Sequence, residues 1–102
     1  MDTGRKSGNR MPSFNVGDYI ALDCEVQPGP FDEERLVTIE TVDGMISGFI
    51  RRSELREDNG RWQVRGKVRS FTPNSIEVLI RGSFFTTNGI ANVPPHIAAT
   101  AA

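Results

Sequence analysis

The sequence predicts a single all-β domain, a mostly antiparallel small barrel of five or six strands, and three observations point to it. Valine and isoleucine together number 16 against four leucines, and β-branched side chains favour pleated strands over helices. Clusters of Gly, Pro, Asn and Asp recur about every ten residues, a spacing typical of β-sandwiches and barrels. Apolar and polar residues alternate between these clusters, which is typical of strands with one buried face.

The positions of the strands follow from where this alternation holds. Along residues 16–27 one parity is shared by Val16, Ile20, Leu22, Cys24 and Val26, and the other is taken by Tyr19, Asp23, Glu25 and Gln27. Residues 61–70 alternate small or apolar side chains with a row of cations, and residues 76–80 place three β-branched side chains on one face. We therefore expect strands at 18–27, 34–42, 45–50, 61–71, 75–86 and 89–93.

Glycine marks the expected turns. Three turn clusters contain dipeptides that tolerate positive φ at both central positions of a tight hairpin, namely Asp43-Gly44, Asn59-Gly60 and Asn88-Gly89. Gly66 interrupts an expected strand and predicts a bulge or sharp bend there. Residues 52–56 are long enough for one short helical turn.

The ends of the chain differ from its middle. We expect residues 1–12 to form a disordered basic arm, residues 13–93 to form the barrel domain and residues 94–102 to form a flexible tail that frays.

Several classes of protein do not fit this sequence. No apolar run approaches the roughly 20 residues needed to cross a bilayer, and the polar, basic start is no secretory signal. Cys24, the only cysteine, forms no intrachain disulfide, so a cytoplasmic, reducing setting is expected. One Cys and one His do not build a structural zinc site. We expect no metal, no cofactor and no membrane partner.

The net charge of −1 conceals a polarised sequence. Residues 17–50 contain eight acidic side chains and one basic side chain, which gives −7, whereas residues 51–81 contain eight basic and four acidic side chains, which gives +4. Folding could bring these halves together, because opposite charges on neighbouring strands stabilise a sheet by roughly 0.2–1 kcal/mol per pair.

A row of cations, Arg61, Arg65, Lys67 and Arg69, shares one face of an expected strand. One interpretation is a nucleic-acid surface, since arginine makes bidentate contacts to phosphate, with Tyr19, Phe71, Phe84 and Phe85 as candidate stacking platforms. The interpretation we favour is a solvated strand face that pairs with Asp23 and Glu25. The near-neutral chain lacks the basic excess of a dedicated nucleic-acid binder.

Apolar residues also fall on expected outer positions. The Phe84-Phe85 pair breaks the alternation, so one ring should face solvent or a partner. Tyr19 and Leu79 have outward parity as well. Exposed apolar patches mark interfaces, so Tyr19, Leu79, Phe84 and Phe85 are the candidate protein-interaction residues.

No catalytic grouping is visible, and we do not expect an enzyme. The sequence contains no nucleophile-elbow, zinc-protease or phosphate-binding glycine motif. His96 has no partner that the sequence indicates, and Cys24 has the parity of a small core residue. The run from Asp32 to Glu34 carries oxygen ligands for a divalent cation, but a loop that leads into a strand is the favoured interpretation.

The stretch from Asp43 to Leu55 resembles the back half of SH3-like barrels, in which a Gly- and aromatic-containing hairpin strand runs into a one-turn helix that ends in Leu. The turn at Gly17-Asp18 before the first long strand also looks like the entry to a small barrel. Arg51 replaces the usual proline, and the tyrosines and tryptophans of a proline-rich-peptide groove are absent. The resemblance therefore implies a fold type and not peptide recognition, and an OB-like barrel is the close alternative.

These observations predict a non-catalytic binding module that contacts a protein partner or a second copy of itself. The alternative is nucleic-acid binding through the row of cations, with help from the basic arm.

Overall fold

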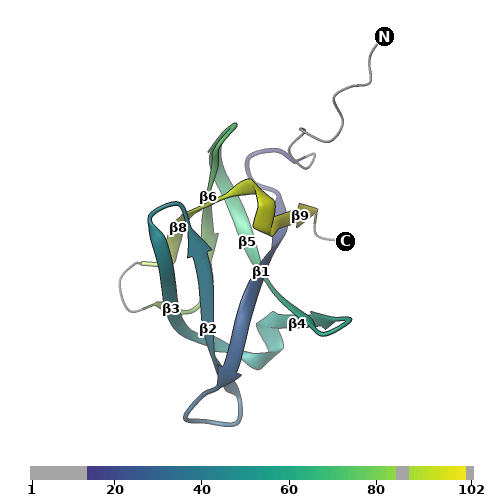
Figure 1. Ribbon diagram of the computed structural model, residues 1–102, viewed down its shortest axis with the longest axis vertical. Coiled ribbons are helices and arrows are strands. Elements are labelled where there is room, and N and C mark those ends of the chain that lie inside the picture. Colours follow the sequence, from purple (N-terminus) through teal and green to yellow (C-terminus); the bar gives the residue numbers. More distant parts are fainter. Residues whose placement is uncertain (1–13, 85–87, 101–102) are drawn as a thin grey trace.

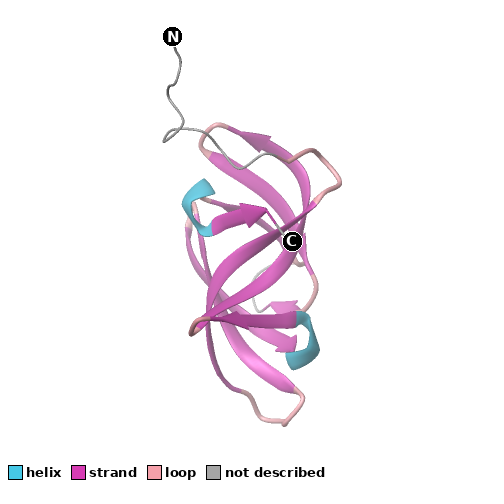
Figure 2. Cartoon of the chain, turned by 90° about the vertical axis from the view of Figure 1, so that its right-hand side faces the viewer, coloured by secondary structure: helices cyan, strands magenta, loops and turns pink. Residues whose placement is uncertain are grey.

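The computed structural model describes residues 14–84 and 88–100, and it confirms the all-β fold class. Within these residues strands dominate, and the helical content is limited to two short 3-10 turns that lie far apart (Figure 2). In chain order the elements are β1 Tyr19–Pro28, β2 Glu34–Thr41, β3 Gly44–Arg51, η2 Arg52–Glu54, β4 Leu55–Asp58, β5 Arg61–Thr72, β6 Ser75–Ile80, β7 Ser83–Phe84, β8 Ile90–Val93, η3 Pro95–Ile97 and β9 Ala98–Thr100.

The strands form one antiparallel sheet that curls into a half-barrel (Figure 1). Its order is β7-β3-β2-β1-β5-β6-β8, with β4 paired to β5 and β9 paired to β1. The long strand β1 is central, because its residues 19–24 pair with β5 and its residues 25–28 pair with β2. At the open side the Val42 N–H donates to the Asn92 carbonyl over 2.9 Å, which joins the β2–β3 turn to β8.

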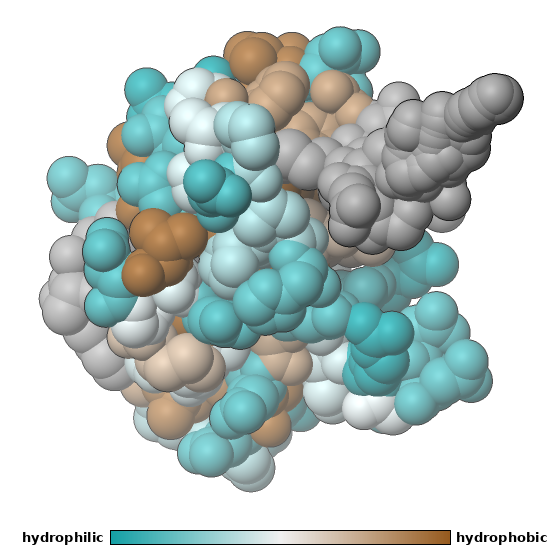
Figure 3. All heavy atoms as spheres, turned by 45° about the horizontal axis from the view of Figure 1, so that its top comes forward, coloured by the Kyte–Doolittle hydropathy of each residue, from teal (hydrophilic) through white to brown (hydrophobic). Residues whose placement is uncertain are grey.

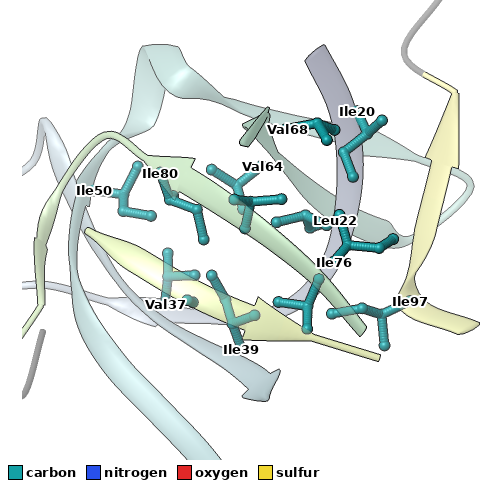
Figure 4. Close-up of a cluster of buried hydrophobic side chains, with 13 residues drawn as sticks. Ile20, Leu22, Val37, Ile39, Ile50, Val64, Val68, Ile76, Ile80 and Ile97 are labelled. Carbon is teal, nitrogen blue, oxygen red and sulfur yellow. The ribbon is translucent and has the colours of Figure 1, made fainter. Parts of the chain in front are cut away.

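The core occupies the concave side of the sheet (Figure 4). It consists of the one-parity side chains that the alternation indicates, and in the described residues its buried members are all apolar. The fully buried side chains are Ile20, Leu22, Val37, Ile39, Ile50, Val68, Ile76, Val78, Ile80 and Val93. Because successive side chains alternate across a strand, their neighbours are placed on the outer face.

Gly66 does not mark the bulge that the sequence predicts at that position. It pairs in regular register with Ile20 of β1 and Ile80 of β6. A Cβ there would lie 3.1 Å from atoms of Leu22 and Val78, so the absence of a side chain lets the core close over β5. The register shift lies farther along β5, between Val68 and Ser70.

The segment 52–56 is only partly helical. The 3-10 turn η2 ends at Glu54, and Leu55 begins strand β4 with extended backbone angles. A hairpin turn then joins β4 to β5, with Asn59 at φ 54° and Gly60 at φ 81°. Both central positions are therefore left-handed, as the sequence predicts for this dipeptide. At the Asp43-Gly44 turn only the glycine has positive φ.

The last predicted strands are shorter than expected, and the tail contains structure. The strand expected at 75–86 divides, since β6 ends at Ile80 and β7 pairs separately with β3. In the segment expected to fray, η3 and β9 follow Pro94, and Ile97 is 7% exposed. β9 pairs with β1 at Ile20, Ala21 and Leu22. The expected basic arm, residues 1–12, lies outside the described residues.

Candidate interaction surface

Tyr19 and Leu79, two of the predicted interaction residues, lie in one row across three strands. Tyr19 of β1 is opposite Lys67 of β5, and Lys67 is opposite Leu79 of β6. Residues that are directly opposite on neighbouring strands share a face of the sheet. Tyr19 is 48% exposed and Leu79 is 44% exposed, so this face is the outer one. The fold thus brings together residues that are 60 positions apart in the sequence.

The other two predicted interaction residues are not joined to this row. Phe84 lies in β7, where it is opposite Gly48 of β3. Phe85 lies outside the described residues, so its place in the surface stays a prediction. Phe71 is opposite Ile76, which is a core residue, and its ring packs edge-on against Phe14 with centroids 5.1 Å apart. Phe71 therefore offers no stacking platform on the outer face.

Arg65 lies beside Tyr19 on the outer face. Its guanidinium carbon is 5.2 Å from the centroid of the Tyr19 ring. A cation over the face of an aromatic ring at an exposed site contributes about 0.5–1 kcal/mol. Arginine presents several N–H donors in its plane, so a guanidinium that contacts a ring through its face keeps donors for an anionic group.

Two of the four cations in the predicted row lie beside carboxylates, and the other two form no ion pair among the described residues. Arg61 forms an ion pair with Asp23 at 2.5 Å, and Gln63 Nε2 donates to the same carboxylate over 3.1 Å. Arg69, at the register shift, lies 4.0 Å from Glu77. In the part of the chain that the structure describes, Arg65 and Lys67 form no ion pair.

Glu25, which the favoured interpretation places against the cations, is not beside them. It pairs with Thr38 of β2, where β1 has already left β5. The expectation that the cations are neutralised by Asp23 and Glu25 therefore holds for Arg61 through Asp23 alone. The physical reason is the change of partner along β1.

A small cavity of about 180 Å³ opens on the outer face. It is lined by Tyr19, Glu54, Arg65, Leu79 and Arg81. Sequence reasoning did not single out Arg81, although it follows the end of β6 and has the same parity as Leu79. From here on, the term outer face means only the part of the convex side that is formed by Tyr19, Arg65, Lys67, Leu79 and Arg81.

Two further cavities continue from the outer face toward the β1–β2 loop. The first, of about 430 Å³, shares Glu54 and Arg81 with the small cavity, and the second, of about 370 Å³, shares Glu34 and Arg51 with the first. The second ends at Phe31, Asp32 and Glu33. We call this chain of cavities the groove.

The two ends of the groove differ in charge. The loop end carries three carboxylates, those of Asp32, Glu33 and Glu34, against one cation, Arg51. They lie next to Phe31, which is 68% exposed. The loop projects from the body of the molecule at the bottom of Figure 1. The outer-face end carries Arg65, Lys67 and Arg81. The separation of acidic from basic residues along the sequence thus corresponds to an acidic end and a basic end of the groove.

The acidic run at the loop end lies in a turn that leads into a strand. Glu34 begins β2, as the favoured interpretation of this run expects. Across residues 14–84 and 88–100, no group of three His, Cys, Asp or Glu side chains is arranged to hold a metal ion.

Cys24 is a poor nucleophile in its environment. Burial and, to a smaller extent, the neighbouring Asp23 carboxylate together raise the pKa of its thiol to about 12. Thiolates are the reactive form of cysteine, so this thiol stays protonated near neutral pH. The side chain packs against the core, in agreement with its parity.

His96 has a partner that sequence reasoning missed. Its Nε2 lies 2.9 Å from Glu40 Oε1 of β2, across 56 positions of the sequence. Both side chains are largely exposed, at 67% for His96 and 43% for Glu40. The contact links η3 to β2 at the open side of the half-barrel, which only the fold reveals.

The surface in Figure 3 mixes apolar and polar groups. Apolar residues are interspersed among hydrophilic ones on the face shown, and they do not merge into one broad patch. The exposed large apolar residues in the described ranges come from separate elements, including Phe31, Met45 and Leu79. Single exposed apolar residues are normal, so the outer face is notable for combining Tyr19 and Leu79 with unpaired cations.

No helix in the described ranges is long and apolar enough to span a membrane. Comparison of the chain with protein-family models, with curated proteins and with solved structures finds no match.

Proposed function

We propose that this protein is a non-catalytic binding module that contacts a protein partner through the outer face. The observation that carries the proposal is the cross-strand row in which Tyr19 and Leu79 lie half exposed on either side of Lys67. Large amphipathic and apolar side chains on a rigid sheet contribute contact area at little cost in conformational entropy.

The chemistry of the reactive side chains supports a non-catalytic role. The thiol of Cys24 is kept protonated by burial. The His96–Glu40 pair lies largely exposed and is not accompanied by a nucleophile in the contacts that it makes among the described residues. A pair of this kind stabilises the fold as a surface contact.

We also propose that the half-barrel belongs with the small SH3-like or OB-like barrels. The β2–β3 hairpin that runs into η2 and then Leu55 supports the SH3-like type. The partly open sheet, with a long central β1 that bends between β2 and β5, supports the OB-like type.

Nucleic-acid binding is the second candidate function. Arg65 and Lys67 support it, because they form no ion pair among the described residues, and Arg81 adds a third cation to the same face. Arg61 and Arg69 count against it, since each lies beside a carboxylate.

The proposed function is tested by substituting two apolar residues of similar exposure, Leu79 on the outer face and Val42 away from it. We expect Leu79→Asp to abolish contact with protein partners, because it replaces an apolar side chain of the outer face by a carboxylate. Val42→Asp is the matched control, since Val42 is 48% exposed in the β2–β3 turn, away from the outer face. The measurement is quantitative cross-linking of the purified chain, alone and in a cell extract, for both variants and the unmodified chain.

Loss of cross-linked protein with Leu79→Asp and its retention with Val42→Asp would support the proposal. Equal cross-linking by both variants would contradict it. A labelled single-stranded oligonucleotide distinguishes the second candidate. Binding that falls steeply with salt, and that Lys67→Glu weakens, would favour nucleic acid instead.

A further inference from the structure

We infer that the partner is a second copy of this chain, bound about a twofold axis so that the loop end of each groove meets the outer face of the other. This inference rests on the proposed function and names the partner. It is carried by the opposite charges at the two ends of the groove.

The groove is continuous from one end to the other. Glu34 and Arg51 line both cavities nearest the loop, and Glu54 and Arg81 line both cavities nearest the outer face. The acidic loop and the basic outer face therefore belong to one surface of the molecule, and a partner that lies along the groove meets both.

Each end carries charge that the described residues leave available. Arg65 contacts the Tyr19 ring, and neither it nor Lys67 or Arg81 forms an ion pair in the described ranges. At the other end, Arg35 Nη1 donates to the backbone carbonyls of Asp32 and Glu34. Arg51 lines the loop-end cavity together with three carboxylates, so the carboxylates outnumber it there. Glu54 lines the same cavity as Arg65 and Arg81, and these two cations outnumber it. Lys67, opposite Tyr19 and Leu79, adds a third positive charge to the face.

Twofold symmetry turns this polarity into complementarity. In a twofold pair the same patch is used on both copies, so a contact between one loop and one outer face is made twice. A surface that is acidic at one end and basic at the other matches itself after a half-turn. Complementary charge favours this register and opposes the parallel one, in which like charges meet.

The apolar groups match as well. Phe31 is the most exposed of the large apolar residues in the described ranges, and it lies beside the two loop carboxylates. The small cavity, which Tyr19 and Leu79 line together with three charged side chains, has a volume of about 180 Å³. A cavity of about 150 Å³ holds a benzene ring, so this one is large enough for the Phe31 ring of the second copy.

The experiment measures the mass of the full-length chain by sedimentation as its concentration rises from about 1 μM to about 1 mM, the range of weak to moderate affinities. We expect the mass to rise from 11.3 kDa toward twice that value. We also expect the rise to weaken as salt is added, because the contact includes exposed charges. A mass that stays at 11.3 kDa over the whole range would overturn the inference.

A charge exchange tests the arrangement itself. Arg81→Glu and Asp32→Lys each place like charges together at both contacts of a twofold pair, so each variant alone should lose at least about tenfold in affinity. In an equimolar mixture, one contact regains the native pair and the other receives the reversed pair. The mixture should therefore dimerise again. Failure of the mixture to dimerise while each variant stays folded would overturn the arrangement.

Arg69→Glu is the matched control, because Arg69 is an exposed cation of β5 that lines none of the three cavities of the groove. It should dimerise like the unmodified chain, and circular dichroism checks that every variant is folded. If the mass stays constant but cross-linking to another protein depends on Leu79, the second copy is wrong and the proposed function stands. If neither is observed, both are wrong.

Discussion

At the scale of single residues, environment decides what each reactive group can do. Cys24 has ordinary thiol chemistry in an unfolded chain, but in the fold its burial raises the pKa to about 12 from 9.0. Arg65 and Arg61 are chemically identical and lie on the same strand, yet one contacts an aromatic ring and the other a carboxylate. The outer face is therefore defined by what surrounds each cation and not by the number of cations.

The raised pKa of Cys24 predicts slow alkylation and a loss of stability at high pH. Near pH 8 the folded chain should react with iodoacetamide more than about tenfold more slowly than the chain in denaturant, because less thiolate is present. A folded-state pKa above the unfolded value favours folding at low pH. This contribution is complete below about pH 9 and declines as the pH rises toward 12. Equal alkylation rates for the folded and unfolded chain would contradict this account.

At the scale of elements, the sequence predicts strands best where one face is buried and the other is exposed to solvent, because apolar and polar side chains then alternate. The core parity of β1, β5 and β6 is predicted because one face is buried and the other is wet. β4 is missed because its residues Leu55–Asp58 show no such contrast, and its strand is formed by pairing with β5. Pairing is a tertiary effect that local pattern does not encode.

The same reasoning explains the end of the chain. The residues after Val93 have little charge and no clear alternation, which predicts a loose tail. Pairing of β9 with β1 and burial of Ile97 follow from the gap that β2 leaves beside the first half of β1. In the same way, the His96–Glu40 contact and the meeting of Tyr19 with Leu79 depend on strand order and not on spacing.

The docking of this segment has a measurable consequence. Ile97→Ala should lower the free energy of unfolding by about 2–3 kcal/mol, because it removes a buried side chain from the core cluster. Val42→Ala, at an exposed position, should change it by less than about 0.5 kcal/mol. Urea unfolding of both variants gives the comparison. An unchanged midpoint for Ile97→Ala would mean that the segment adds nothing to the stability of the fold.

At the scale of the whole molecule, the distribution of charge matters more than its sum. A net charge of −1 predicts no particular partner, but the chain folds with acidic side chains around the β1–β2 loop and unpaired cations on the outer face. A small net charge also weakens the repulsion between copies, so association of like molecules meets little long-range resistance. The proposed partner thus follows from the same polarity that is visible in the sequence.

The most direct measurement is a set of ¹H–¹⁵N correlation spectra of the full-length chain over the same concentration range. If the second copy binds as inferred, amide signals should move at both ends of the groove, at Phe31–Glu33 and at Tyr19, Leu79 and Arg81. Signals of Val42 and Met45 in the β2–β3 turn should stay in place. A spectrum that does not change with concentration, or changes centred on the β2–β3 turn, would contradict the account.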